Sequence, residues 1–97
     1  QCTAVVACND LMGIGCMNAC RELGLDIPGD ISIVSLDNTD YSLCTNPAMT
    51  SVDMMQGQVG EEAANFVMSR ILDKRTYQKN MAFSPVLEEP NSVRKRK

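Results

Sequence analysis

Two polar pairs stand directly after two short apolar runs, and they are the best candidates for chemistry in this sequence. Asn9-Asp10 follows the run at residues 3–8, and Asp37-Asn38 follows the run at residues 31–36. Carboxylates accept hydrogen bonds, whereas asparagine amides both donate and accept them. Together the four side chains suit a small molecule that carries several hydroxyl or amide groups.

Each of these residues also has a purely structural interpretation. Asp10 is well placed to be the N-cap of a following helix, because a side-chain oxygen at that position accepts from a free backbone amide. Asp37-Asn38 could simply begin a turn, since both residue types favour turns. Asn9 is the hardest of the four to explain by local structure alone.

Catalytic and metal-binding patterns are lacking. The sequence contains no histidine, so neither a Ser-His-Asp nor a Cys-His arrangement can form within it. It also has no glycine-rich phosphate-binding motif. Cys16 and Cys20 are one helical turn apart, but no second pair of ligands completes a zinc site. We therefore predict no enzyme activity, no metal and no cofactor.

The elements that must position the polar pairs form one βαβ unit over residues 3–37. The runs at 3–8 and 31–36 are apolar without alternation, which is typical of strands covered on both faces. Residues 11–23 between them predict a helix with wide apolar coverage, ended by Gly24. Strands joined in this way are parallel, and ligands bind outside their carboxyl ends. Both polar pairs are therefore expected at one rim.

The second half of the chain predicts three further segments. A polar loop at 38–47 leads to a short strand at 49–52, and a helix is expected over 56–72. Residues 81–88 read as a last strand, in which Pro85 indicates an edge or a bend. The helix carries an apolar stripe of Val59, Ala63, Phe66, Val67 and Ile71.

Length and composition limit the broad class. The 97 residues make one domain at most, and 44% hydrophobic with 22% charged residues is ordinary globular usage. The net charge of −3 argues against a nucleic-acid surface on this segment. The single basic cluster, at residues 94–97, is expected to be a solvated tail.

Targeting signals and cysteine residues indicate in which cellular compartment the protein is expected. No run of eighteen apolar residues and no signal peptide is present, so we expect no membrane contact. The chain opens in a strand-like run without a methionine, which indicates a fragment of a longer protein. Five cysteines, an odd number, fit a reducing cytoplasm and are expected to stay unpaired; they are Cys2, Cys8, Cys16, Cys20 and Cys44.

Several segments, in this order and spacing, resemble the C-terminal part of LacI/GalR-type bacterial transcription regulators. The segments are TAVVACNDLMGIG at 3–15, RELGLDIPGDISIV at 21–34, LDNT at 36–39, NPAMTSV at 46–52, and Gly60 with Ala63-Ala64. Each piece is weakly diagnostic, but their combination is specific and spans nearly the whole chain.

The resemblance implies an α/β, parallel-sheet, periplasmic-binding-protein-like (type I) fold, of which this chain is an incomplete fragment. Such a domain has two lobes with the effector between them. Residues 1–46 would belong to the C-terminal lobe, 47–86 to the crossover and helix of the other lobe, and 87–97 to the return strand and basic tail.

The resemblance also implies effector-binding residues. Asn9 and Asp37 match positions that touch the effector, with Asp10 beside them, and Met54 and Gln56 match positions that line the cleft from the other lobe. The sequence departs from the family where Met54-Met55 replaces a more usual Gln-Pro and where Pro90 replaces a frequent arginine. Both departures leave the identity of the effector open.

The implied function is the effector-binding and dimerisation segment of a cytoplasmic repressor that senses a sugar or related metabolite. In the family, the helix at 11–23 and the loop after Asp37 form the interface of a homodimer. Operator DNA would be bound only by an N-terminal headpiece that these residues do not include.

Two other classes remain as alternatives. An exported sugar-binding protein of a transporter shares the fold, and its gene would show a signal peptide in place of a helix-turn-helix. A flavodoxin-like redox enzyme would need a phosphate-cradling loop, which the sequence lacks.

Overall fold

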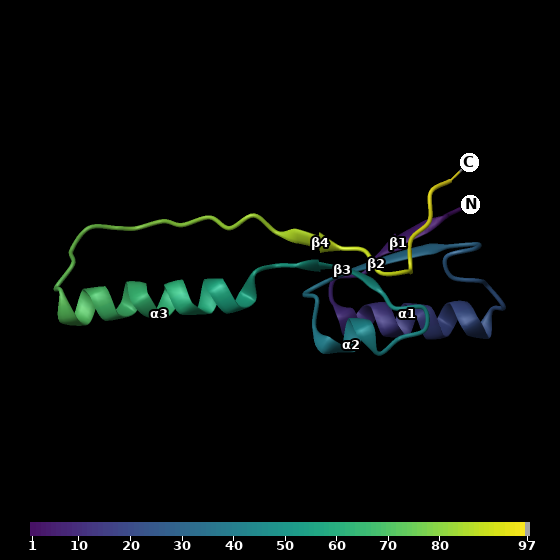
Figure 1. The fold of residues 1–97 in the computed structure, drawn as a ribbon, viewed down its shortest axis with the longest axis horizontal. Coiled ribbons are helices and arrows are strands. Elements are labelled where there is room, and N and C mark those ends of the chain that lie inside the picture. The colour runs from purple at the N-terminus through teal and green to yellow at the C-terminus, as the bar shows by residue number, and fades with distance from the viewer. Residues whose placement is uncertain (97) are drawn as a thin grey trace.

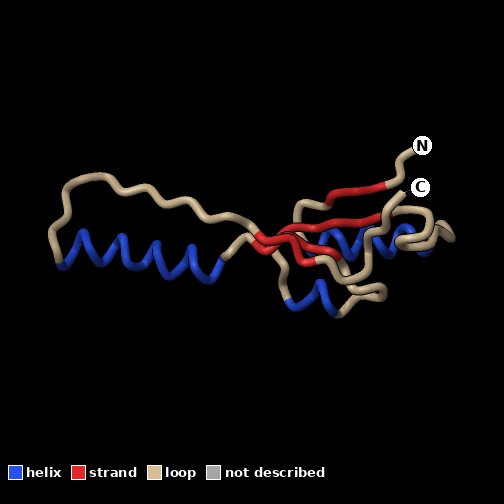
Figure 2. The backbone as a smooth tube through the Cα atoms, turned by 45° about the horizontal axis from the view of Figure 1, so that its top comes forward, coloured by secondary structure: helices blue, strands red, loops and turns tan. Residues whose placement is uncertain are grey.

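The computed structural model describes residues 1–96 and shows a four-stranded, mainly parallel sheet with three helices (Figure 2). The strands lie in the order β1-β2-β3-β4; β1, β2 and β3 are parallel, and β4 is antiparallel to β3. The fold class and the parallel βαβ unit are thus confirmed. The strands are β1 Ala4–Val6, β2 Ser32–Leu36, β3 Thr50–Asp53 and β4 Val86–Glu88; the helices are α1 Asp10–Glu22, α2 Asp40–Leu43 and α3 Gln56–Leu72.

The molecule is elongated, with extents of 59 × 25 × 20 Å. The helices α1 and α2 lie beside the sheet at one end, whereas α3 projects from the other end and an extended segment runs back from it to β4 (Figure 1). The division of the chain into residues 1–46, 47–86 and 87–97 of a two-lobed domain stays a prediction. None of the helices in residues 1–96 is long and apolar enough to cross a membrane.

The hydrophobic core lies between α1 and the sheet. Gly13 lets the helix approach closely, because a Cβ at this position would stand 2.5 Å from Met49 Sδ and 3.2 Å from Ser35 Cβ. The N-terminal half of α1 therefore packs directly against the sheet. The core side chains are Met17, Cys20, Ile27, Ile31, Ile33 and Met49.

Gly24 ends α1 as the sequence predicted. It has a left-handed backbone, with φ of 72°, which glycine adopts without a Cβ penalty. The Gly24 amide donates to the Arg21 carbonyl and the Leu25 amide donates to the Cys20 carbonyl, both over 2.9 Å. This pair of bonds is a Schellman motif, which satisfies carbonyls that the helix end would otherwise leave open.

Two predictions for the second half were wrong in part. The segment 38–47 is not all loop, because α2 forms one turn within it, and the Ser42 hydroxyl donates to the Thr39 carbonyl over 2.8 Å. The last strand is confined to residues 86–88, since only these pair with β3. Pro85 stands immediately before β4, and β4 is an edge strand of this sheet, as the proline indicated.

After β4 the chain returns to the sheet at Ser92, a fully buried residue that bridges β2 and β3. Its carbonyl accepts from the Ile33 amide over 2.9 Å, and its hydroxyl donates to the Ile33 carbonyl over 2.5 Å. The same hydroxyl accepts from the Thr50 amide over 2.6 Å. A single serine thereby links the first ends of the two central strands.

The basic tail follows this bridge. Residues 94–96 are exposed, and the Arg96 guanidinium donates to the Asp30 carbonyl over 2.7 Å. Lys97, the last residue of the predicted tail, lies outside the described residues.

Candidate functional site

Asn9 stands at the carboxyl end of β1 and is the N-cap of α1. Its backbone is extended, and its Oδ1 accepts a 2.9 Å hydrogen bond from the Met12 amide. The prediction that Asp10 caps the helix was therefore wrong by one residue. Either residue type can cap a helix, but Asp10 is already the first helical residue and its side chain turns into the protein.

Asp10 is only 2% exposed, and its carboxylate accepts four hydrogen bonds. Oδ1 accepts from the hydroxyls of Ser35 at 2.5 Å and Ser51 at 2.7 Å. Oδ2 accepts from the amide and the hydroxyl of Thr39, each at 2.6 Å. Ser35 and Ser51 are cross-strand partners in β2 and β3, so their side chains reach the carboxylate together.

These hydrogen bonds decide the charge state of Asp10. Burial taken alone raises the pKa of this carboxyl, because it penalises the ionised form. The donors from Ser35, Thr39 and Ser51 outweigh that effect and hold the pKa below its ordinary value of 3.8. Asp10 is thus an anion at neutral pH, stabilised by neutral hydrogen-bond donors.

Asp37 and Asn38 form a left-handed turn at the carboxyl end of β2. Their φ angles are 97° and 49°, a region that Asp and Asn tolerate better than most residues. The Asp37 amide donates to the Val52 carbonyl over 3.0 Å, and the Asn38 amide donates to the Ser51 hydroxyl over 2.9 Å. Both anchors lie on β3, which therefore fixes the turn.

Gln56 comes to Asp37 from the first turn of α3. Its side-chain amide donates to Asp37 Oδ1 over 3.1 Å, so the structure brings two of the predicted site residues together. Met54 is exposed nearby in sequence, and Met55 between them has a left-handed φ of 58°. The Met55 amide donates to the Asp53 carboxylate over 2.8 Å, which fixes the path from β3 into α3.

The three hydroxyl residues around Asp10 were missed by the sequence analysis. A signal for one of them exists, because Ser35 stands inside the apolar run at residues 31–36, which predicts a buried strand. A hydroxyl in such a place needs a hydrogen-bond partner. Ser51 lies in the mixed segment Thr50–Asp53, which gives no such signal. Thr39 offers no comparable signal in its polar loop.

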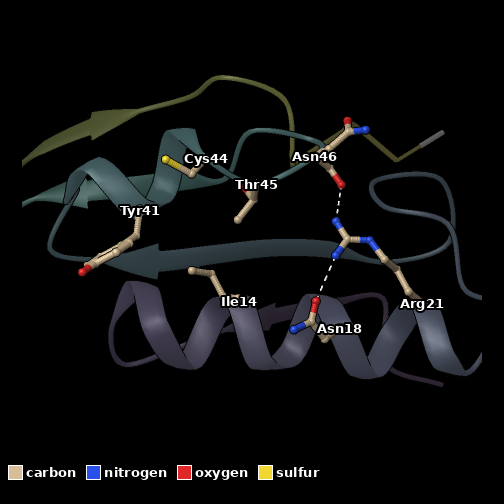
Figure 3. Close-up of a pocket in the computed structure, with 7 residues that line it drawn as sticks. All are labelled: Ile14, Asn18, Arg21, Tyr41, Cys44, Thr45 and Asn46. Atoms are coloured by element: carbon tan, nitrogen blue, oxygen red, sulfur yellow. Dashed lines mark hydrogen bonds between the residues drawn. The ribbon is translucent and has the colours of Figure 1, made fainter.

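Away from these residues, a hollow lies between α1 and α2 (Figure 3). It has a volume of about 470 Å³. Arg21 closes one end, since its guanidinium donates to Asn18 Oδ1 over 3.0 Å and to the Asn46 carbonyl. We call this hollow the α1–α2 groove; it is lined by Ile14, Asn18, Arg21, Tyr41, Cys44, Thr45 and Asn46.

The thiols and carboxylates of residues 1–96 form no candidate metal site. No group of three or more His, Cys, Asp or Glu side chains there could hold a metal ion. Cys20 is buried, Cys16 is half-buried, and Cys2, Cys8 and Cys44 are exposed. Four of the cysteines lie in apolar stretches of the sequence, but only Cys20 is buried there, whereas Cys2 and Cys8 flank the short strand β1 and are exposed.

Comparison with known proteins shows which family and which solved structures this chain is similar to. The whole chain, residues 1–97, matches the model of the periplasmic binding protein-like domain family. Among curated relatives, the HTH-type transcriptional repressor PurR of Klebsiella pneumoniae is 35% identical over 91 residues, and that of Salmonella arizonae is 34% identical. The match covers 94% of this chain but 27% of each repressor.

Solved structures agree. The transcriptional regulator CelR in complex with cellobiose superimposes with a TM-score of 0.88 at 29% identity, over 92% of this chain and 27% of that one. A LacI-family regulator from Enterococcus faecium with bound ribose gives a TM-score of 0.87 at 26% identity, over 94% and 34% of the two chains. The homologues and structural neighbours are thus transcription regulators, of which this chain spans about a third or less.

Proposed function

The chain belongs to the periplasmic binding protein-like domain family, and we propose that it is the effector-binding and dimerisation segment of a bacterial LacI-type transcription regulator. The effector is a sugar or a related small metabolite. The full protein acts as a repressor in the cytoplasm and is not an enzyme.

The hydrogen bond from Gln56 to Asp37 carries this proposal. It lies where the chain passes from the sheet to α3, which is where the cleft between two lobes would open. Asp37 supplies an acceptor and Gln56 both a donor and an acceptor, as a polyhydroxylated ligand requires. The neighbours that were solved with cellobiose and ribose support a sugar as the ligand class.

We assign the contacts as follows. Asp37, Gln56 and Asn9 bind the effector, and Asn9 does so with its amide nitrogen, because its Oδ1 caps α1. Met54 forms an apolar part of the cleft wall. Asp10, predicted as a fifth contact, has both oxygens engaged by protein donors and acts on the site indirectly.

The partner is a second copy of the protein, which covers α1 and α2. Four large apolar side chains stand exposed on these two helices, and one of them, Tyr41, lines the α1–α2 groove. Operator DNA binds through a headpiece outside this chain, in keeping with the net charge of −3. The exposed side chains are Leu11, Met12, Tyr41 and Leu43.

An exported sugar-binding protein is the second candidate. The relatives argue for the regulator, because the curated matches are named transcriptional repressors and the solved neighbours transcription regulators. A helix-turn-helix upstream of this chain in its gene would support the regulator, and a signal peptide there would support the exported protein.

Ligand-induced stabilisation of the full-length protein tests the sensing function. Ribose and cellobiose are the first probes, followed by a library of small metabolites. A compound that binds the native state raises the melting temperature by mass action, and we expect at least one to do so for the wild type and not for Asp37→Ala. A library without any hit, or equal shifts in both proteins, would contradict the proposal.

A further inference from the structure

The backbone amides of the two residues after Asp37 are both linked by hydrogen bonds to the carboxylate of Asp10, one directly and one through a serine hydroxyl. The Thr39 amide donates directly to Asp10 Oδ2 over 2.6 Å. The Asn38 amide donates to the Ser51 hydroxyl over 2.9 Å, and that hydroxyl donates in turn to Asp10 Oδ1 over 2.7 Å. One buried anion thus holds two consecutive peptide units.

These peptide units need such an anchor. Asp37 and Asn38 have φ angles of 97° and 49°, in the region where a Cβ crowds the following carbonyl. Without its hydrogen bonds the turn would relax toward the ordinary right-handed or extended backbone. The side chain of Asp37 would then leave its position beside Gln56.

The two carboxylate oxygens of Asp10 have different partners: Oδ1 is bound by the strands β2 and β3, and Oδ2 is bound by the turn that follows β2. Oδ1 accepts only from Ser35 and Ser51, which are paired residues in β2 and β3. Oδ2 accepts only from Thr39, by its amide and its hydroxyl. Thr39 is also the residue before α2, so the same carboxylate holds the start of this helix in place. The helix α2 forms one side of the α1–α2 groove.

We propose that Asp10 is a positioning residue of the effector site: it holds the turn 37–39 in the conformation that presents Asp37 to the effector, without touching the effector itself. This inference rests on the proposed function in so far as the site binds an effector, but the anchoring of the turn by Asp10 can be tested without any ligand. It also makes the rim of the sheet and the start of α2 a single rigid unit.

Two serine variants provide a matched test in the full-length protein. Ser35 and Ser51 are both fully buried and both donate to Asp10 Oδ1, but only Ser51 also accepts the Asn38 amide. Hydrogen–deuterium exchange is followed for a peptide covering residues 37–44 and a reference peptide covering residues 12–22. We expect Ser51→Ala to speed exchange in the first peptide roughly tenfold, with the reference unchanged, and Ser35→Ala to have little effect on either.

Asp10→Asn tests the carboxylate itself. Asparagine offers a single acceptor oxygen, so either Thr39 or the two serines lose their partner, and the peptide 37–44 should again exchange faster than the reference. Equal acceleration of both peptides in all three variants would mean that Asp10 contributes only to global stability, which would overturn the proposal. Should Asp10→Asn fail to fold, Thr39→Val replaces it, because this variant removes the hydroxyl that donates to Asp10 Oδ2 and leaves Ser51 untouched; unchanged exchange in the peptide 37–44 would then overturn the proposal.

Calorimetry with ribose and cellobiose separates this inference from the proposed function. If either sugar binds the wild type, Asp10→Asn should weaken its binding roughly tenfold. Unchanged affinity together with faster exchange would overturn the role of Asp10 at the effector site. If neither sugar binds, the sensing of these sugars fails, while the exchange pattern still supports or overturns the anchoring of the turn.

Discussion

The side-chain amide of Gln56 donates a 3.1 Å hydrogen bond to the carboxylate of Asp37, although the two residues are 19 positions apart. One stands at the end of β2 and the other begins α3. The bond therefore joins the sheet to the projecting helix at the proposed effector site. A ligand that enters there meets a carboxylate already oriented by the protein.

Asp37→Ala should weaken effector binding by roughly tenfold or more, because the polar partner on the ligand loses its acceptor. Calorimetry on the full-length protein, with a compound found by the stabilisation screen, measures the change. Glu22→Ala is the control, since Glu22 is an exposed carboxylate at the far end of α1. Equal affinity of wild type and Asp37→Ala would refute the assignment.

The free energy of unfolding should fall in acid because of Asp10. Its pKa is lowered in the folded state, so its contribution is fully present above its ordinary value of 3.8 and is lost as pH falls through the folded value. Denaturant titrations of wild type and Asp10→Asn over this range measure the difference. The wild type should lose its advantage over the variant in acid; a constant difference at every pH would show that the charge of Asp10 is not involved.

Two glycines of α1 should respond in opposite directions to the same substitution. Gly13→Ala places a methyl group against Met49 and Ser35 and should cost about 1–3 kcal/mol of stability. Gly15→Ala meets nothing within 4 Å and should gain up to about 1 kcal/mol through helix propensity. Thermal melting of both variants checks the pair. Similar melting temperatures would mean that α1 does not approach the sheet as closely as described.

Thiol titration of the 97-residue chain should give five free thiols after denaturation, as expected in a reducing compartment. In the native state the exposed thiols of Cys2, Cys8 and Cys44 should react first. Cys16 should be slow, because burial and then the neighbouring Cys20 raise its pKa and so reduce the reactive thiolate. A reproducible count of three or one after non-reducing lysis would instead indicate disulfides and favour the exported protein.

The isolated 97-residue chain should self-associate. No residue of α3 is buried, and Val59, Val67 and Ile71 are 43%, 58% and 63% exposed. Covering each such side chain fully is worth roughly 1.5–3 kcal/mol, a large sum for a domain with a total stability of about 5–15 kcal/mol. Sedimentation at micromolar concentration should show a dimer or larger species. A well-folded monomer would mean that the apolar face of α3 needs no cover.

The local elements could be predicted from the sequence because their causes are local. The apolar stripe predicted α3 at its observed bounds of Gln56–Leu72, and Gly24 marked the end of α1. The unbroken apolar runs predicted two parallel strands, which the pairing of β1 with β2 confirms. The expectation of cover on both faces was wrong for β1, because Ala4 and Val6 are exposed there. The resemblance added Asp37 and Gln56 as residues of one cleft, and the structure joins them.

Local sequence patterns were thus sufficient for helices α1 and α3, for the parallel strands and for the rim at which the polar pairs lie, but not for α2. Only the tertiary structure decided that Asn9 caps α1 while Asp10 turns inward, because the donors that stabilise Asp10 lie 25 and 41 residues away at Ser35 and Ser51. It likewise decided the place of Ser92, whose partner Ile33 is 59 residues away. Periodicity encodes which face of an element is apolar, whereas the partner of a buried polar group depends on strand register and on how closely a helix approaches the sheet.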